Sequence, residues 1–301
     1  MEIIRSPNGD KRQRKIMSQG SKDRKNRRKN MKREDIIKEL VERGYNVQAQ
    51  DIIKNGVSLE GILIKDDSAT APIIYTEHLI DAAEAYGKSL SEVVDVVIRA
   101  YEQRRNKSLN VNQFLNRDFI LSHIYVGLQK KSNEDIEKKT CDLEGLESFL
   151  YIRSEEGQYS AKLNQNIMKS ANLAADEAWE RAKKNTFAET QVQSVASLLA
   201  EMSGISFCKE MEAASPLYII SNKWKFRGAS AILDKRALAA FGKEHGADKL
   251  IAIPSSIHEM LIMPYEDNAD LDAISDMVTE INLEQVEPEE RLTDRAYLIE
   301  L

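Results

Sequence analysis

Near the start of the chain, the spacing of apolar residues predicts one helix followed by a β-hairpin. Apolar residues recur at helical spacing from Glu34 onward, and Gly44 stands where a left-handed residue would end the helix. Apolar and polar residues then alternate over 47–54 and 57–65, on either side of the dipeptide Asn55-Gly56. Because Asn-Gly is a preferred dipeptide of the type I′ turn, the two segments are expected to pair as a hairpin.

Two more helices are expected after this hairpin. A short strand at 73–75 precedes a helix over 77–86, which Gly87 closes. Ser89 and Glu92 then have the spacing of a capping box, in which each side chain accepts from a free backbone N–H of the other residue. Apolar residues recur at helical spacing after this box, so the second helix starts here.

The middle of the chain contains both the helical spacing of apolar residues and the alternation typical of strands. The strands expected from it are 119–128, 146–153 and 158–163, and the last two form a hairpin that turns at 155–157. The helices expected from it are 173–184, with Asn172 as its N-cap, and 188–202. The Met and aromatic residues of these helices are assigned to the core.

The last third has the clearest pattern. Apolar runs at 216–220 and 226–233 precede a helix over 234–245 that Gly246 ends, strands at 250–253 and 257–263, a helix over 269–281 and a last strand at 296–299. Strands and helices interleave without a regular βαβ repeat. We therefore expect an α+β fold with a mixed, largely antiparallel sheet, preceded by a disordered basic leader.

Charge is distributed unevenly along the 301 residues, whose formal net charge is −6. Residues 1–30 contain eleven Lys or Arg and three acids, which leaves 32 bases against 46 acids for the remainder. The leader lacks apolar periodicity and is expected to be disordered. The body is expected to form a small N-terminal α+β module over 31–106 and a main module over 107–301, divided near the polar linker at 103–108, or one continuous unit.

The basic leader has three interpretations. It is a flexible arm that pairs with nucleic-acid phosphates, or a solubilising tail, or a segment that is not translated naturally because the chain starts at Met31. The candidate nucleic-acid-binding residues are Lys11, Arg12, Arg14, Lys15, Arg24, Lys25, Arg27, Arg28 and Lys29, together with Lys225 and Arg227 in the body. The acidic body argues against a nucleic-acid surface elsewhere.

Several classes of site are disfavoured by the sequence. No apolar run is long enough for a membrane span or a secretion signal, so a cytoplasmic protein without membrane contact is expected. Cys141 and Cys208 are expected to be buried free thiols, and neither a metal site nor a cofactor is predicted. Gly87-Lys88-Ser89 lacks the first glycine of a P-loop, since Ala82 stands there, and Ile262 replaces the second histidine of an H-E-x-x-H motif.

Polar residues gather where strands 250–253 and 257–263 meet. Ser255, Ser256, His258 and Glu259 are the candidate catalytic residues of a hydrolase, because a hydroxyl activated by an oriented base is the nucleophile of such enzymes. If 257–263 is a strand, His258 and Glu259 point to opposite faces, which opposes a Ser–His–Glu relay. The alternative is a hairpin turn whose polar residues satisfy the turn backbone, with His258 as the first site residue to test.

Residues 224–227, Trp-Lys-Phe-Arg, form a cluster of aromatic and basic side chains within the body. Such clusters can stack bases and bind phosphates. The alternative is a hairpin loop with half-buried aromatic side chains.

The body also resembles a family of bacterial proteins of unknown function, common in anaerobic Gram-positive bacteria. The segments that carry the resemblance are 55–61 with Tyr75, 87–93, 216–222, Gly228-Ala229, 253–264 and 292–297. The family segment begins near Met31, and the resemblance implies no activity, ligand or catalytic residue. The leading hypothesis is a non-enzymatic binding or regulatory protein with a protein partner. The alternatives are a hydrolase using the turn at 255–259 and a nucleic-acid binder using the basic arm.

Overall fold

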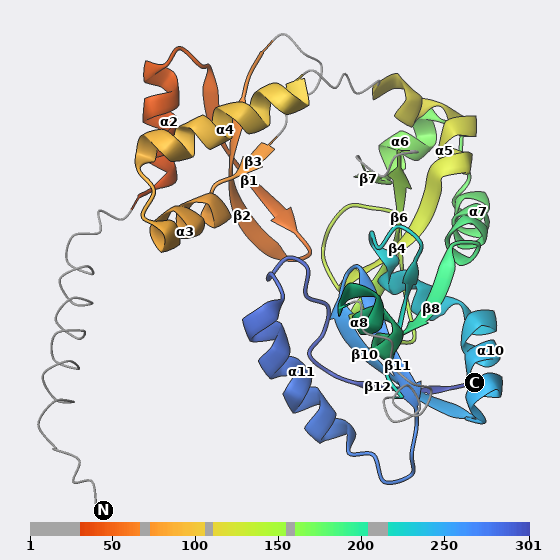
Figure 1. Cartoon of the computed structure of the whole chain (residues 1–301). Helices are drawn as coiled ribbons and strands as arrows, with labels where there is room; N and C mark the ends of the chain where they lie inside the picture. Colours follow the sequence, from red (N-terminus) through yellow and green to blue (C-terminus); the bar gives the residue numbers. More distant parts are fainter. Residues whose placement is uncertain (1–30, 67–72, 106–110, 155–159, 204–215) are drawn as a thin grey trace, which may run out of the picture. The chain divides into compact units, whose positions relative to one another are not determined.

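A computed structural model describes residues 31–66, 73–105, 111–154, 160–203 and 216–301 (Figure 1). The described residues divide into two compact units. The first contains the chain up to Ile52 and from Ser58 to Arg105, and the second contains Ile53–Val57 and everything from Val111 onward. The basic leader, the turn at 155–157 and Cys208 lie outside the described residues.

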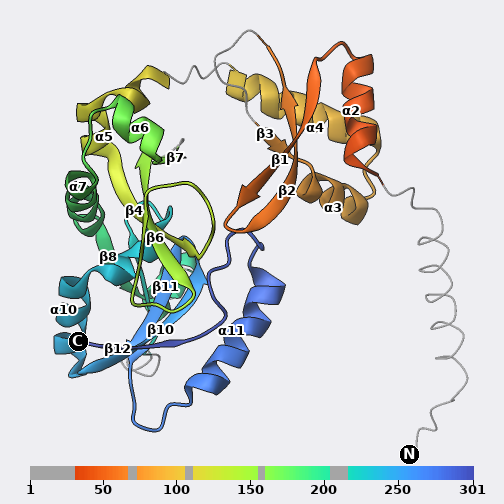
Figure 2. The ribbon, with the colours of Figure 1, turned by 180° about the vertical axis from the view of Figure 1, so that it is seen from behind.

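The first unit packs helices against a three-stranded antiparallel sheet of order β1-β2-β3, seen from behind in Figure 2. Its elements are α2 (Arg33–Glu42), β1 (Val47–Lys54), β2 (Val57–Ile64), β3 (Ile73–Tyr75), α3 (Glu77–Tyr86) and α4 (Leu90–Arg105). Their apolar sides meet in one core that includes Leu40 of α2, Ile62 of β2 and Val94 of α4, all with almost no exposed surface.

The turn and cap signals of this region are confirmed. Asn55 and Gly56 have φ of 51° and 80°, as the tight turn requires. Gly44 and Gly87 follow α2 and α3 with φ of 91° and 65°. Because Gly87 ends a helix and does not follow a strand, the resemblance of this site to a P-loop has no structural basis. The Ser89 N–H donates to the Glu92 carboxylate at 2.9 Å, as expected for a capping box.

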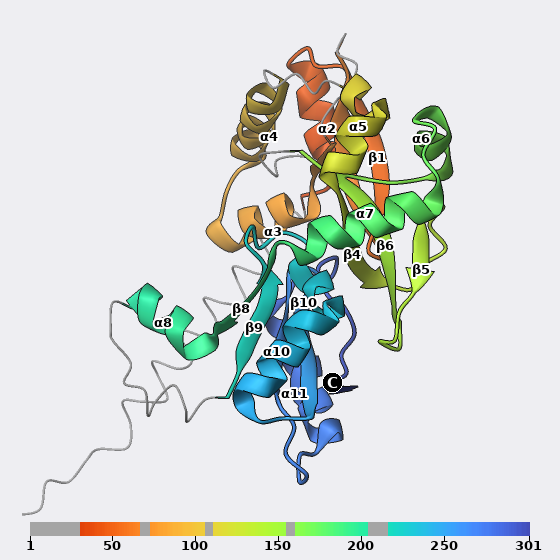
Figure 3. The same cartoon turned by 90° about the vertical axis from the view of Figure 1, so that its right-hand side faces the viewer.

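The second unit contains two antiparallel sheets, shown from the side in Figure 3. One has the order β12-β10-β11-β9-β8, and the other has β4-β6-β5 with β7 on β6. The helical elements are η1 (Val111–Leu115), α5 (Arg117–His123), α6 (Gln165–Ser170), α7 (Ala175–Phe187), α8 (Val195–Ser203), η2 (Gly228–Leu233), α10 (Lys235–His245) and α11 (Leu271–Gln285). The strands are β4 (Ile124–Lys130), β5 (Lys138–Thr140), β6 (Leu146–Arg153), β7 (Ser160–Lys162), β8 (Thr190–Ser194), β9 (Tyr218–Asn222), β10 (Lys249–Ser256), β11 (Glu259–Pro264) and β12 (Tyr297–Glu300). The α+β prediction with antiparallel sheets and interleaved helices is confirmed.

The core of this unit lies where α10 and η2 cover the five-stranded sheet. Leu238 and Phe241 of α10 pack with Ile220 of β9 and Ile262 of β11, and each of these side chains is buried. The helix has this position because Asp234 caps its N-terminus and Gly246, at φ 65°, ends it. This helix face is one part of the apolar surface whose burial is the dominant favourable contribution to folding.

Three expectations for the middle of the chain are wrong. Residues 119–128 do not form one strand, because Asn116 accepts from the Phe119 N–H at 2.9 Å and caps the short helix α5 before β4 begins. Asn172 is not an N-cap but the left-handed residue after α6, with φ 49°. Residues 190–194 form the edge strand β8 rather than part of a helix.

The hairpin of β10 and β11 turns later than expected. β10 continues through Ser256, with an irregular register between Pro254 and Ser256, and β11 begins at Glu259. Ile257 and His258 therefore form the turn itself. His258 and Glu259 therefore do not alternate along one strand, because β11 begins only at Glu259.

Candidate functional site

One face of the four-stranded sheet combines aromatic rings with charged side chains. Along β6, Phe149, Tyr151 and Arg153 are two residues apart and therefore share a face. Tyr125 of β4 and Lys162 of β7 are both register partners of Tyr151 and lie on the same side. Phe149 and Tyr151 are at most 1% exposed. The sheet thus offers an aromatic floor flanked by two cations.

The loop that covers this floor follows β9 and is held by the buried side chain of Asn222. Its Nδ2 donates to the Phe226 carbonyl at 2.8 Å, and its Oδ1 accepts from the Trp224 and Phe226 N–H groups at 3.0 and 3.3 Å. Lys225 and Arg227 both have φ of 50°, a left-handed conformation that costs a non-glycine residue about 1–2 kcal/mol. The contacts of Asn222 stabilise this strained loop.

Gly228 lets the loop approach the turn between β10 and β11. A Cβ atom at this position would lie 2.2 Å from Ser221 Oγ and 2.6 Å from the His258 carbonyl oxygen. Ser221 Oγ itself donates to that carbonyl at 2.7 Å. The Arg227 N–H donates to His258 Nδ1 at 3.2 Å. The Ala229 N–H donates to the Ile257 carbonyl at 3.3 Å, so the loop and the turn are joined by hydrogen bonds on both sides of Gly228.

The side chain of Arg227 lies over the aromatic floor. Its guanidinium carbon is 5.5 Å from the centre of the Phe149 ring and 5.7 Å from the centres of the Tyr151 and Phe226 rings. Its Nε is buried and has no hydrogen-bond partner, and within the described part of the chain no carboxylate lies within ion-pair distance. Burial lowers the pKa of Arg227, although an arginine keeps its charge at physiological pH.

Arg153 lies on the same face and is paired with a carboxylate, although its Nη1 is also buried without a hydrogen-bond partner among the described residues. Its Nη2 donates to both carboxylate oxygens of Glu189, at 2.9 and 3.0 Å, while its guanidinium stacks 4.0 Å above the Tyr125 ring. Trp224 Nε1 also donates to Glu189, at 3.3 Å. Two arginines thus share one aromatic surface, and Arg227 is the one that lacks a carboxylate partner among the described residues.

The charged neighbours of Arg227 are engaged with other groups. Lys162 lies 5.1 Å from the centre of the Phe149 ring and donates to Gln129 Oε1 at 2.8 Å and to Glu134. Burial lowers the pKa of Lys162, and the hydrogen bond to Glu134 partly offsets this effect. Glu134 and Glu290 favour the charged form of Arg227 through space without contacting it.

The residues of the hydrolase hypothesis are close in space but are paired with other groups. Ser256 Oγ accepts from the His258 N–H at 3.1 Å, and Ser255 Oγ lies 3.5 Å from Glu259. The imidazole of His258 accepts at Nδ1 from the backbone of Arg227, and its Nε2 lies 3.4 Å from Glu290. Both of these serine contacts of the turn leave out the imidazole: in the described residues, the ring nitrogens of His258 make no hydrogen bond to a serine hydroxyl, which a Ser–His relay needs.

The basic residues proposed from the sequence have different positions. Lys225 is exposed on the loop, and Arg227 turns inward onto the sheet. The nine candidates of the leader lie outside the described residues. Sequence reasoning missed Phe149, Tyr151 and Lys162 because only strand pairing brings them under the loop. The alternation of residues 147–153 was the available indication of a shared face.

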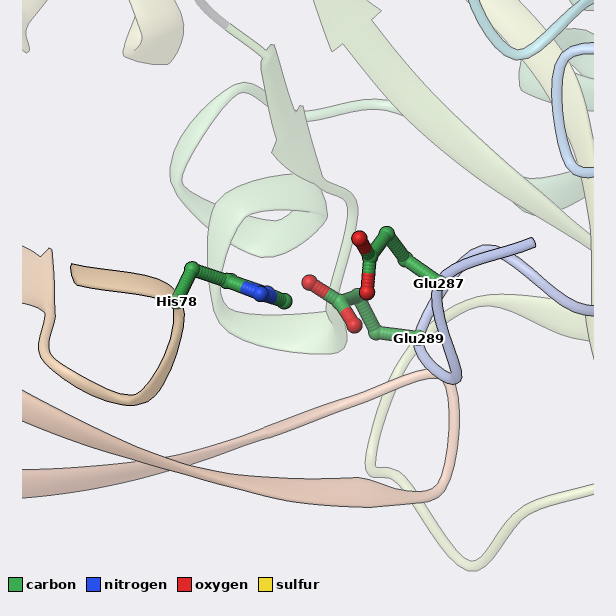
Figure 4. Close-up of side chains that lie close together, drawn as sticks. All are labelled: His78, Glu287 and Glu289. Carbon is green, nitrogen blue, oxygen red and sulfur yellow. The ribbon is translucent and has the colours of Figure 1, made fainter. Parts of the chain in front are cut away.

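Two further acidic residues lie close together after α11. Figure 4 shows the carboxylates of Glu287 and Glu289 beside each other on the segment that leads toward β12. His78, also labelled there, belongs to α3 of the first unit and is not assigned to a site with them. Two neighbouring acidic residues do not by themselves define a metal site.

The fold and the Arg227 site define a two-unit α+β protein with a partly buried guanidinium on an aromatic sheet face, and no carboxylate of the described residues pairs with it. The chain belongs to the family of unknown function DUF5688, whose model matches residues 29–300. This membership confirms the resemblance to a family of unknown function. Comparisons with curated proteins and with solved structures gave no match. Among the described helices, none combines the length and the apolar composition needed to cross a bilayer.

Proposed function

We propose that this protein is a binding protein that recognises a small anionic ligand, a carboxylate or a phosphate, through Arg227. The proposal rests on the surroundings of the Arg227 guanidinium. Its Nε is buried without a hydrogen-bond partner, and the described residues provide no carboxylate for it. Burying an unpaired charge costs several kcal/mol, so a protein that keeps one gains stability when an anion completes the pair.

The surroundings of Arg227 favour recognition of an anion. The three aromatic rings and the strained loop fix the orientation of the guanidinium before any ligand arrives, which lowers the entropy cost of binding. The planar guanidinium donates two parallel hydrogen bonds to a carboxylate or phosphate. His258 and Glu290, whose side chains are 26% and 37% exposed, lie where solvent reaches this part of the unit.

The contacts of the turn at 255–259 support binding over hydrolysis. Both imidazole nitrogens of His258 are occupied, one by the Arg227 backbone and the other by Glu290. A general base for a serine nucleophile requires one of them. We therefore infer that His258 stabilises the loop through its hydrogen bond with the Arg227 backbone and is not a general base.

The test is a titration of inorganic phosphate and of succinate against the wild-type chain and two variants, followed by thermal unfolding and by heat of binding. Arg227→Met removes the guanidinium and is expected to abolish the response. Lys225→Met is the matched control, because Lys225 has the same charge and the same φ of 50° on the same loop but is exposed. Equal responses in both variants would exclude Arg227 as the recognition group.

A ligand at one hundred times its dissociation constant should stabilise the wild-type chain by about 2.7 kcal/mol. The absence of any stabilisation by either anion at millimolar concentration would refute the proposal. A response that survives in Arg227→Met would place the anion elsewhere.

A further inference from the structure

One hollow in the second unit is bordered by β5, α7 and the start of α10, three elements that can be followed in Figure 3. Its volume is ≈ 470 Å³, within the range of small-molecule sites. Val126, Phe187 and Leu233 give it an apolar floor. Neither Arg227 nor any residue of the aromatic floor on which Arg227 lies is part of the lining of this hollow.

The rim of this hollow is basic. Lys139 comes from β5, Lys183 from α7, and Lys235 and Arg236 from the first turn of α10. These segments are far apart in sequence, and the fold brings their side chains to one opening. Excluding the leader, the chain has 32 bases against 46 acids, so four cations around one hollow run against its overall charge.

The carboxylates near this rim neutralise it only in part. Asp234 is buried and accepts from the Arg236 and Ala237 backbone N–H groups as the cap of α10, and its Oδ1 also lies 3.5 Å from the Arg236 Nε, so this arginine is already partly paired. Asp142 is exposed and is the other acid in the lining. Lys139 Nζ lies 4.0 Å from Asp176 Oδ1, whereas Lys183 and Lys235 form no ion pair with any described residue. Like charges that converge in this way repel one another unless an anion lies between them.

We propose that this hollow binds a small molecule that carries a phosphate group on an apolar or aromatic body, the class to which mononucleotides belong. The phosphate contacts Lys183, Lys235 and Arg236, and the body packs against Phe187 and Leu233. Lys139 is already held at the edge, since its Nζ lies 4.9 Å from the centre of the Trp179 ring. The site is independent of Arg227 and does not rest on the function proposed above.

The chain provides a separate reporter for each site. It has two tryptophans: Trp179 lines this hollow, and Trp224 lies on the loop beside Arg227. A Trp224→Phe variant of the full chain therefore reports on the hollow through Trp179 alone. We would titrate this variant with AMP, with pyrophosphate and with inorganic phosphate, at low and at high salt.

The decisive comparison uses two double variants with the same change of charge on the same two helices. Lys183→Met with Lys235→Met removes two rim cations, whereas Lys184→Met with Lys243→Met removes two exposed lysines of α7 and α10 outside the lining. All four are surface positions, so both variants should fold. We expect the first to bind AMP at least about tenfold more weakly and the second to stay within about twofold.

Further outcomes also decide the proposal. AMP should bind more tightly than inorganic phosphate because of the apolar floor, and its affinity should fall with salt. Equal affinity in the two double variants, or no Trp179 response to any of the three probes, would overturn the proposal. So would loss of AMP binding in Arg227→Met, because the anion would then occupy the Arg227 site.

Discussion

The replacement Arg227→Met tests whether the guanidinium of Arg227 lowers the stability of the ligand-free protein. Methionine has a similar length and packs well against aromatic rings, so it can fill the space over Phe149, Tyr151 and Phe226. The change removes a charge whose Nε is buried and makes no hydrogen bond to any described residue. For most buried arginines such a change is destabilising, and here we expect the opposite.

The magnitude follows from two opposing contributions. Relief of desolvation returns several kcal/mol, whereas loss of the cation–π contacts costs about 2 kcal/mol at a desolvated position, and the through-space attraction of Glu134 and Glu290 is also lost. Methionine at φ 50° carries the same backbone strain as arginine. We expect the variant to be about 1 kcal/mol more stable than the wild type, which raises Tm by roughly 2–4 °C in a unit of this size.

Arg153→Met is the matched comparison on the same sheet face. It leaves Glu189, whose side chain is 11% exposed, without its two hydrogen bonds from the guanidinium. Removal of one partner of a buried pair costs about 3–5 kcal/mol. Because Lys223 Nζ stays 3.6 Å from Glu189, the cost should lie near the lower end of that range.

The assay is urea and thermal unfolding of the three proteins in a buffer without phosphate or carboxylate anions. A loss of more than about 2 kcal/mol in Arg227→Met, similar to that of Arg153→Met, would refute the reasoning. It would mean that the guanidinium of Arg227 has a protein partner in solution and needs no ligand.

Three other predictions concern the loop and the first unit. Asn222→Ala should cost about 1–3 kcal/mol in urea unfolding, because three backbone groups of the loop lose their partner, and a change below about 0.5 kcal/mol would contradict the role given to this side chain. Gly228→Ala should be destabilised by about 3 kcal/mol or more, since the new methyl group meets Ser221 Oγ at 2.2 Å, and a native Tm would show that the loop can move away. Hydrogen bonds from Ser89 lower the pKa of Glu92 from 4.5 to about 2, so its contribution is complete above pH 4.5 and is lost as the pH falls toward 2. Amide exchange at Ser89, corrected for its intrinsic pH dependence, should therefore lose protection over that interval in the wild type but not in Glu92→Gln, and equal profiles would argue against it.

Local signals in the sequence predicted a large part of this fold. Asn55-Gly56, Gly87 and the pair Ser89 and Glu92 each act through backbone geometry within a few residues, so their spacing alone fixes a turn, a helix end and a cap. The helix over 234–245 was predicted for the same reason.

The errors occurred where a local pattern competes with a neighbouring element. Residues 119–123 are as apolar as a typical strand, but they belong to a helix because Asn116 caps its N-terminus. Residues 190–194 continue an apolar helical pattern, yet they pair with β9 as an edge strand. Tertiary pairing of this kind leaves little trace in the periodicity of one segment.

The candidate site was predicted only in part. The aromatic-basic cluster at 224–227 drew attention to Arg227, and His258 was chosen for its chemistry. The aromatic floor of Phe149 and Tyr151 depends on strand pairing across separate segments. That no described carboxylate pairs with Arg227 follows only from the three-dimensional positions of its neighbours.

The most direct test of the central claim is a crystal structure of the full chain grown with inorganic phosphate, compared with one grown without it. We predict a tetrahedral anion within hydrogen-bond distance of the Arg227 guanidinium, and a guanidinium with no carboxylate partner when phosphate is omitted. A structure in which Glu134 or Glu290 pairs with Arg227, unchanged by phosphate, would contradict this prediction.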